Sequence, residues 1–208
     1  QKALEIRKKI FGQRNLDVAR SLYNLAGLYL VMKKYSEAEK YCQEALDVRE
    51  KVLGPFHKDI ATTVQLLGDI YRQQNDLILA ESLYRRALEV RESALGPNHP
   101  DTAFTLNTLG VLCYAQGKVK EAISYTERAA HLYRTIWTGP NIDVAKVLHN
   151  LAGYYRVIGR FYDAEKLYQE ALSIKQNVLP TNHPDIATTY YQLAELYKIQ
   201  GFPEKAEP

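Results

Sequence analysis

Cysteine is scarce in this chain, and neither sign of charge dominates. Two cysteines in 208 residues provide no disulfide framework, which favours a reducing, cytoplasmic location. The 27 basic and 24 acidic residues leave a net charge of +3, too balanced to indicate nucleic-acid binding. The longest uncharged stretch, 102–117, contains polar residues and falls short of the roughly 18 apolar residues of a membrane-spanning helix. We therefore predict neither a nucleic acid nor a membrane as partner.

The short motifs that are typical of enzymes are also missing. The chain has no Gly-rich phosphate loop, no Gly-x-Ser-x-Gly turn and no His-Glu-x-x-His helix. We therefore predict that it is not an enzyme and that it holds no cofactor and no metal.

What the chain does contain is a repeat of 42 residues. Aspartate, alanine and leucine recur at this spacing in columns of five: Asp17, Asp59, Asp101, Asp143, Asp185; Ala19, Ala61, Ala103, Ala145, Ala187; Leu25, Leu67, Leu109, Leu151, Leu193. A period of this length indicates a solenoid, in which each unit buries its apolar face only against neighbouring units. We divide the chain, as a single solenoid of residues 1–208, into a partial repeat 1–16, repeats 17–58, 59–100, 101–142 and 143–184, and a partial repeat 185–208. The helical pattern runs up to both ends, so we expect a piece of a longer protein.

Each unit is predicted to form two helices. Apolar spacing places first helices near 18–32, 60–74, 102–116, 144–158 and 186–200, each with the repeated aspartate as its expected N-cap. Second helices are expected near 36–53, 78–95, 120–137 and 162–179, ending at breaks such as Gly54-Pro55. Gly117, Gly159 and Gly201 stand between the two helices, where the backbone is expected to need positive φ.

Six residues of the first unit carry a family resemblance. The spacing of Leu22, Leu25, Ala26, Tyr29, Ala38 and Ala45 resembles the tetratricopeptide repeat. The 42-residue period, with the segments 45–54 and 97–101, is similar to the longer variety of kinesin light chains and nephrocystin-3-like proteins. This resemblance implies an all-α, right-handed superhelical solenoid of antiparallel helix pairs.

The resemblance also implies a function, which is to bind an extended peptide of a partner protein in a concave groove lined by first helices. In this chain the implied positions combine basic, amide and aromatic groups, which suit an acidic peptide with aromatic or leucine anchors. The predicted peptide-binding residues are Arg20, Tyr23, Gln65, Arg72, Phe104, Asn107, Tyr114, Lys146, His149, Asn150, Arg156 and Lys198.

Three other interpretations stay open. The groove positions could be solvated helix surface, the array could be structural or self-associating through its cut ends, or it could be the sensor arm of a larger nucleotide-binding regulator. A cargo adaptor such as kinesin light chain is the function we favour.

Two sets of residues resemble reactive sites and are interpreted as structural. His57, His99 and His183 each precede an aspartate by two residues, but their 42-residue spacing prevents them from meeting at one ion, so we expect them to cap the following helices. Cys42 and Cys113 fall in packing columns and are expected to be buried thiols.

Overall fold

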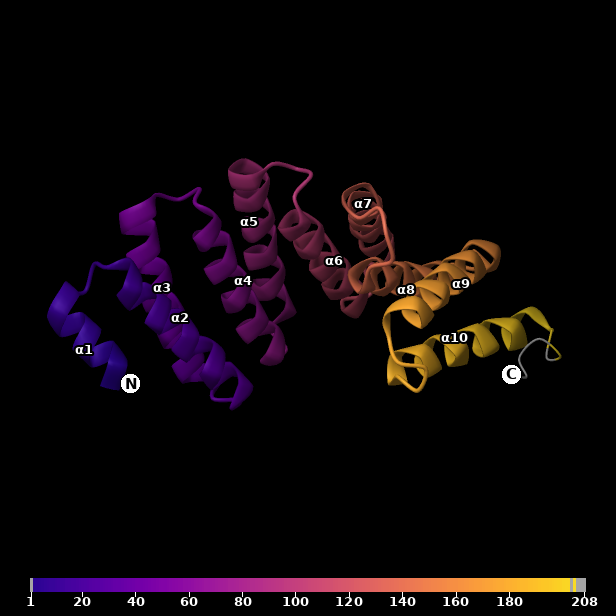
Figure 1. Cartoon of the computed structure of the whole chain (residues 1–208), viewed down its shortest axis with the longest axis horizontal. Coiled ribbons are helices and arrows are strands. Elements are labelled where there is room, and N and C mark those ends of the chain that lie inside the picture. The colour runs from indigo at the N-terminus through magenta and orange to yellow at the C-terminus, as the bar shows by residue number, and fades with distance from the viewer. Residues whose placement is uncertain (1, 203, 205–208) are drawn as a thin grey trace. The chain divides into compact units, whose positions relative to one another are not determined.

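The computed structural model describes residues 2–202 and 204, and within these residues the chain forms α-helices and no strand (Figure 1). The helices are α1 (Lys2–Phe11), α2 (Leu16–Val31), α3 (Tyr35–Leu53), α4 (Lys58–Gln73), α5 (Leu77–Leu95), α6 (Pro100–Ala115), α7 (Val119–Ile136), α8 (Ile142–Val157), α9 (Phe161–Val178) and α10 (Pro184–Gln200). Contacts divide the chain into two compact units, which meet in sequence between Thr105 and Leu106, within α6. No helix in the described part is long and apolar enough to cross a membrane.

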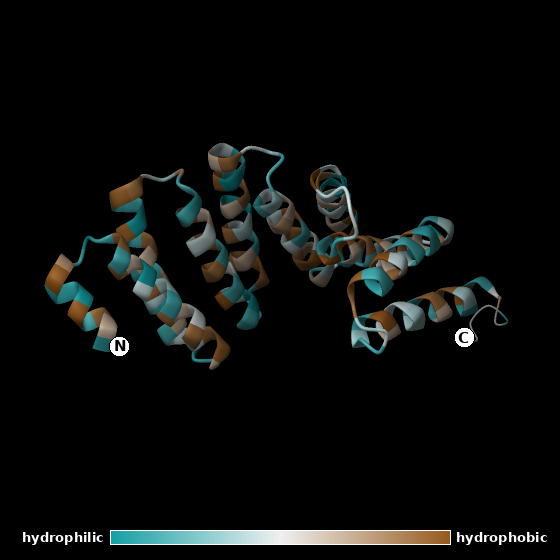
Figure 2. Cartoon of the chain, in the orientation of Figure 1, coloured by the Kyte–Doolittle hydropathy of each residue, from teal (hydrophilic) through white to brown (hydrophobic). Residues whose placement is uncertain are grey.

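The predicted alternation of first and second helices is confirmed. Every first helix, from α2 to α10 in steps of two, begins two residues earlier than predicted. In unit 1, α2 packs mainly against α3 and α4 against α5, and in unit 2 α8 packs against α9. In Figure 2, hydrophilic and hydrophobic residues are mixed along every helix, as expected where each helix buries one stripe against its neighbours.

The predicted aspartate N-caps are wrong. The cap of α2 is Asn15, whose side-chain oxygen accepts the amide of Asp17 at 2.7 Å. Asp17 itself lies in the first turn, where its carboxylate still favours the positive end of the helix dipole. The cap therefore stands two residues before each repeated aspartate.

Histidines take the same capping place in three helices. Nδ1 of His57 accepts the amide of Asp59, and His99 and His183 do the same for Asp101 and Asp185, each at 3.1 Å. Asn141 caps α8 through its oxygen, as Asn15 caps α2. The structural interpretation of the repeated histidines is confirmed, because each one closes the start of a different helix.

The turns inside the helix pairs have the backbone that was predicted. Gly117, Gly159 and Gly201 have φ of 77°, 78° and 80°, a region that suits residues without a Cβ. In the first two pairs the same place is taken by Lys33 and Asn75, with φ of 57° and 64°. Residues with side chains can therefore occupy this turn.

The small-residue columns form the core of each unit. In unit 1, Ala26, Ala38 and Cys42 pack with Leu66, Leu67 and Ile70, and in unit 2 Cys113 and Ala122 pack with Tyr154. The prediction that both cysteines are buried is confirmed, since both have no exposed surface. Burial raises the pKa of the Cys42 thiol to about 12, so the thiol stays protonated at neutral pH.

Four junctions in the described part of the chain connect a second helix to the next first helix through a buried or half-buried cation. Arg49 donates to the carbonyl of Asp59 at 3.0 Å and to the hydroxyl of Thr63, and Lys175 donates to the carbonyl of Asp185 at 3.2 Å and to Thr189 at 2.8 Å. Arg7 bonds to Ser21 and Arg91 to Thr105 in the same way. In every case the hydroxyl stands 14 residues after the cation, and we call these contacts the inter-repeat latches.

One junction replaces both members of the latch. Between α7 and α8, the equivalent positions hold Tyr133 and Val147, which are 4% and 0% exposed. A buried cation without hydrogen-bond acceptors is costly. Because the cation and the hydroxyl are replaced together, these two positions bury no unpaired charge.

The first prediction concerns Gly68. A Cβ there would lie 2.6 Å from the ring of Tyr84, which is fully buried, whereas a Cβ on Gly27 meets nothing within 4 Å. Gly68→Ala should destabilise the chain by about 1–3 kcal/mol through overpacking. Gly27→Ala should stabilise it by about 0.5–1 kcal/mol through helix propensity. Urea unfolding followed by circular dichroism measures both, and equal midpoints for the two variants would contradict the packing argument.

The second prediction concerns the cap of α4. His57→Ala should cost about 0.5–2 kcal/mol, because the amide of Asp59 loses its acceptor. His57→Asn should retain stability, since Asn15 and Asn141 fill the same place in α2 and α8. Chemical unfolding tests this, together with hydrogen exchange at the Asp59 amide. The capping role is wrong if the alanine and asparagine variants are equally stable.

Candidate ligand-binding site

The residues predicted to bind a peptide lie on first helices of both units. In unit 1 they come from α2, α4 and the start of α6, and in unit 2 from the rest of α6, α8 and α10. The Asn, His and Asp residues at the helix starts set where each first helix begins, and the latches hold the second helices against them. These local contacts determine which side chains face outward.

Unit 1 contains a small pocket that brings three of the predicted residues together. Tyr23 of α2, Gln65 of α4 and Phe104 of α6 line it, along with Thr62, Leu66, Asp69 and Arg91, around a volume of about 210 Å³. Such a volume suits one side chain of a ligand. Three successive first helices therefore contribute to a single cavity, each with one of the predicted residues.

The floor of this pocket is polar and buried. Gln65 and Arg91 are 5% and 6% exposed, and Arg91 Nη1 donates to Oε1 of Gln65. Gln65 was predicted to offer its amide to a peptide backbone, but in this structure its oxygen is engaged by Arg91. Arg91 comes from the second helix α5 and was not predicted as a site residue.

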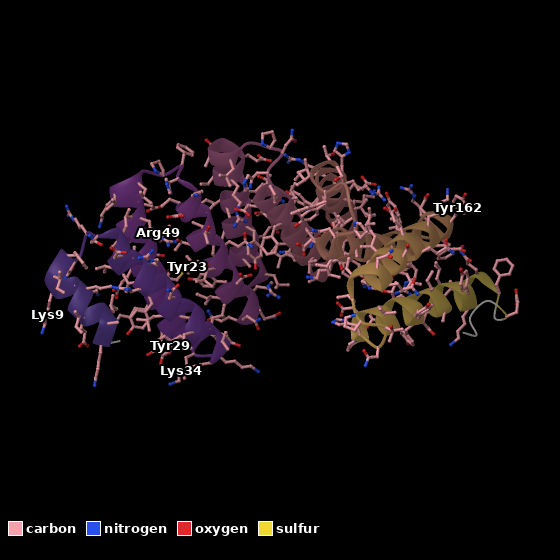
Figure 3. All side chains as sticks on the ribbon, viewed as in Figure 1. Lys9, Tyr23, Tyr29, Lys34, Arg49 and Tyr162 are labelled. Atoms are coloured by element: carbon pink, nitrogen blue, oxygen red, sulfur yellow. The ribbon has the colours of Figure 1, made fainter. Side chains whose placement is uncertain are left out.

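Charged groups of both signs lie beside the aromatic wall of this pocket. The guanidinium of Arg49 lies 5.0 Å from the ring centre of Tyr23, and burial raises the pKa of the Tyr23 phenol (Figure 3). At the rim, Asp69 accepts the hydroxyl of Tyr84 at 2.6 Å, and burial raises the pKa of its carboxyl group. Arg72 Nε lies 3.9 Å from this carboxylate and is partly exposed. A ligand thus meets both a cation and an anion.

Other predicted cations lie on exposed helix surface with acidic neighbours. Arg20 pairs with Asp17, Lys146 with Asp143 at 3.4 Å, and Lys198 with Glu195 at 3.2 Å. Each of these pairs lies within one turn of one helix, where ion pairs contribute little to stability. The lysines and Arg20 therefore remain accessible to solvent and to ligands.

Unit 2 brings a second group of predicted residues together. Asn150 Nδ2 donates to Oδ1 of Asn107 at 3.2 Å, which joins α8 to α6. The ring of Tyr114 stacks on Tyr154 with centroids 4.5 Å apart. Arg156 is half-buried near Tyr168, whose pKa it lowers against the larger effect of burial.

His149, the next residue of this group, is half-buried. Its ring meets Tyr168 edge-on at 5.2 Å, and its Nδ1 lies 3.3 Å from the hydroxyl of Thr189. Burial and the nearby charge of Lys175 lower the pKa of His149 to about 4. The imidazole is therefore neutral at physiological pH and contributes hydrogen bonding rather than charge.

The sequence contained a signal for the buried cations that the prediction missed. Arg91 follows Arg49 by 42 residues and Lys175 follows Arg91 by twice that period, and Thr63, Thr105 and Thr189 follow these cations at a constant distance of 14. A column of cations paired with a column of hydroxyls points to a repeated contact.

Comparison with known proteins identifies the repeat. A family model described as tetratricopeptide repeat matches residues 17–93, 60–135 and 143–208, which together cover most of the chain. The chain belongs to the tetratricopeptide repeat family. No curated protein sequence matches it.

Solved structures share the fold of this tetratricopeptide chain. BtubC (BKLC) from P. vanneervenii is 21% identical, with a TM-score of 0.86 over 99% of this chain and 82% of that one. A putative kinesin light chain of Podosopora anserina with nearly identical TPR-like repeats is 21% identical, with a TM-score of 0.78 over 92% and 91%. MamA protein is 16% identical, with a TM-score of 0.65 over 90% and 85%.

The predicted resemblance and the all-α fold of paired helices are thereby confirmed. Tetratricopeptide domains are in general scaffolds for protein–protein interaction and are generally not enzymes. At these identities the solved structures establish the fold of this chain and do not identify a ligand.

A third prediction follows from His149. The unfolded imidazole titrates near about pH 6.5 and the folded one near 4, so the unfolded state takes up the proton first as pH falls. The stability associated with neutral His149 is present above about pH 6.5 and is lost as pH falls toward 4. His149→Asn should remove about 1–2 kcal/mol of this acid sensitivity, after allowance for solvent screening.

Thermal unfolding at a series of pH values measures this effect. His131→Asn is the matched control, because His131 is exposed on α7. The same dependence on pH in the wild type and in His149→Asn would contradict the prediction.

Proposed function

We propose that this tetratricopeptide domain binds an extended peptide segment of a partner protein across its first helices, as a cargo adaptor does. The observation that carries the proposal is the unit 1 pocket, to which Tyr23, Gln65 and Phe104 contribute from three successive first helices. A pocket of about 210 Å³ accepts one side chain of the peptide, and the exposed ring of Tyr114 favours an aromatic or leucine anchor elsewhere along it.

Cations on the first helices favour acidic residues in the bound peptide. In unit 1, Arg72 lies 3.9 Å from Asp69 of the pocket, and unit 2 carries its own cations, Arg156 and Lys146, on α8. An arginine fork binds a carboxylate in two-point geometry, which fixes the orientation of a peptide as well as its position.

Amide side chains can form hydrogen bonds with the backbone of a bound peptide. Asn107 and Asn150 bond to each other and keep further donor and acceptor capacity, which a peptide backbone can use. Such amides suit a peptide backbone, because every residue of a peptide except proline presents one donor and one acceptor.

The resemblance of the fold to a putative kinesin light chain and to BtubC (BKLC) is consistent with an adaptor role. A structural or self-associating array, or the sensor arm of a larger nucleotide-binding regulator, is the alternative function. Self-association would require a second copy to cover the ends of the array, so the two proposals differ in the mass of the free protein.

The fourth prediction tests peptide binding directly. The probe is a short fluorescent peptide with one tryptophan flanked by aspartate and glutamate residues. Arg72→Glu and Arg156→Glu should each weaken its binding about tenfold, because the reversed charge repels the acidic flanks. Fluorescence anisotropy measures the dissociation constants.

Lys51→Glu is the control, since Lys51 is an exposed cation on the second helix α3. Circular dichroism verifies that each variant is folded, and sedimentation should find the free protein monomeric. Unchanged affinity in both arginine variants rules out the proposed groove, and a concentration-dependent mass without peptide favours the self-associating alternative.

A further inference from the structure

Arg91 takes part in two structural features at once. It is the latch cation that bonds to Thr105, and it also lines the unit 1 pocket beside Tyr23, Gln65 and Phe104. We propose that Arg91 is a specificity-determining residue that reads a single carboxylate of the bound peptide inside this pocket. This inference rests on the proposed peptide-binding function, and it adds a buried cation from a second helix to a site predicted only on first helices.

The acceptor that Arg91 now holds is one that a carboxylate can replace. Its Nη1 donates to the amide oxygen of Gln65, which is neutral. The bond to Gln65 has one ionised partner, whereas a bond to a carboxylate pairs two opposite charges and can be bidentate, and the buried surroundings strengthen it further. A ligand carboxylate therefore displaces Gln65 from Arg91 and leaves the Gln65 amide to bond to the peptide backbone.

The walls restrict which acidic group can enter. Tyr23, Leu66 and Phe104 supply apolar surface, and a volume of about 210 Å³ accommodates one side chain. Asp69 lines the same pocket and is held in place by the hydroxyl of Tyr84. Asp69 repels every anion in proportion to its charge, so a phosphorylated residue, which carries about −1.5 to −2, is disfavoured relative to the single charge of aspartate or glutamate.

Arg91 and Arg72 are expected to act differently. Arg72 is partly exposed at the rim, where salt screens its attraction for an acidic peptide. Arg91 is 6% exposed, so its contact with a carboxylate is screened much less. Arg72 thus attracts acidic peptides in general, whereas Arg91 selects one position of the peptide.

The other latches provide matched controls. Lys175 makes the same contact to Thr189 in unit 2, so its loss reports the cost of a missing latch. Thr105→Val removes the latch acceptor of Arg91 in unit 1 while leaving the guanidinium in place. A purely structural role of Arg91 predicts that these variants behave like Arg91→Met.

The experiment is a double-mutant cycle with the tryptophan-acidic probe peptide. Each acidic residue of the probe is replaced in turn by its amide, and one further probe carries phosphoserine at the sensitive position. Dissociation constants are measured by anisotropy for the wild type, Arg91→Met, Thr105→Val and Lys175→Met. A salt series on the wild type gives a readout that needs no variant.

In the wild type, one acid-to-amide replacement should weaken binding about tenfold, and this penalty should persist at high salt. In Arg91→Met the same replacement should change affinity less than about twofold, while Thr105→Val and Lys175→Met keep the full penalty. The phosphoserine probe should bind more weakly than the aspartate probe.

Two results overturn the proposal, and they differ from failure of the proposed function. A full penalty in Arg91→Met, or a penalty that disappears at high salt in the wild type, removes Arg91 as the reader and leaves peptide binding intact. Absence of binding between the wild type and every probe removes the proposed peptide function itself, and this inference with it.

Discussion

Among the described residues, the core clusters combine helices of successive repeats, so these helices have to come close to one another. The columns of small residues make this approach possible, as Ala26 and Ala38 show by having no exposed surface. At Gly68 the approach is closer still, because even a Cβ would collide with Tyr84. The stability of the array therefore depends on side-chain size at a few repeated positions, since interiors are packed as densely as crystals.

The inter-repeat latches give this close packing a unique register. A buried arginine or lysine is tolerated only where acceptors meet it, and Arg49 finds them in the carbonyl of Asp59 and the hydroxyl of Thr63. A rotation or slip of the next first helix would leave the cation without these partners. The latch thereby orients the first helix, and with it the face that a ligand meets.

In unit 1 one latch residue also lines the pocket formed by Tyr23, Gln65 and Phe104. Arg91 joins α5 to α6 and at the same time forms the polar floor beneath Tyr23 and Phe104. One side chain consequently belongs to both the junction and the pocket, so a change in the junction between repeats alters the pocket. Unit 2 uses a lysine for its latch and places neutral His149 beside the acceptor, which produces a different chemical surface on the same scaffold.

The sequence by itself determined the helices, their pairing, the positive-φ turns at Gly117, Gly159 and Gly201, and the burial of Cys42 and Cys113. These features follow from periodicity and local backbone chemistry, which repeat every 42 residues. The tertiary structure decided the rest. The N-caps are Asn15 and His57 and not the aspartates. Arg91 bonds to the oxygen of Gln65 and lines the pocket. The paired columns of cations and hydroxyls were visible in the sequence, but which columns touch depends on the angle and distance at which two helices pack, and spacing along one chain does not contain that information.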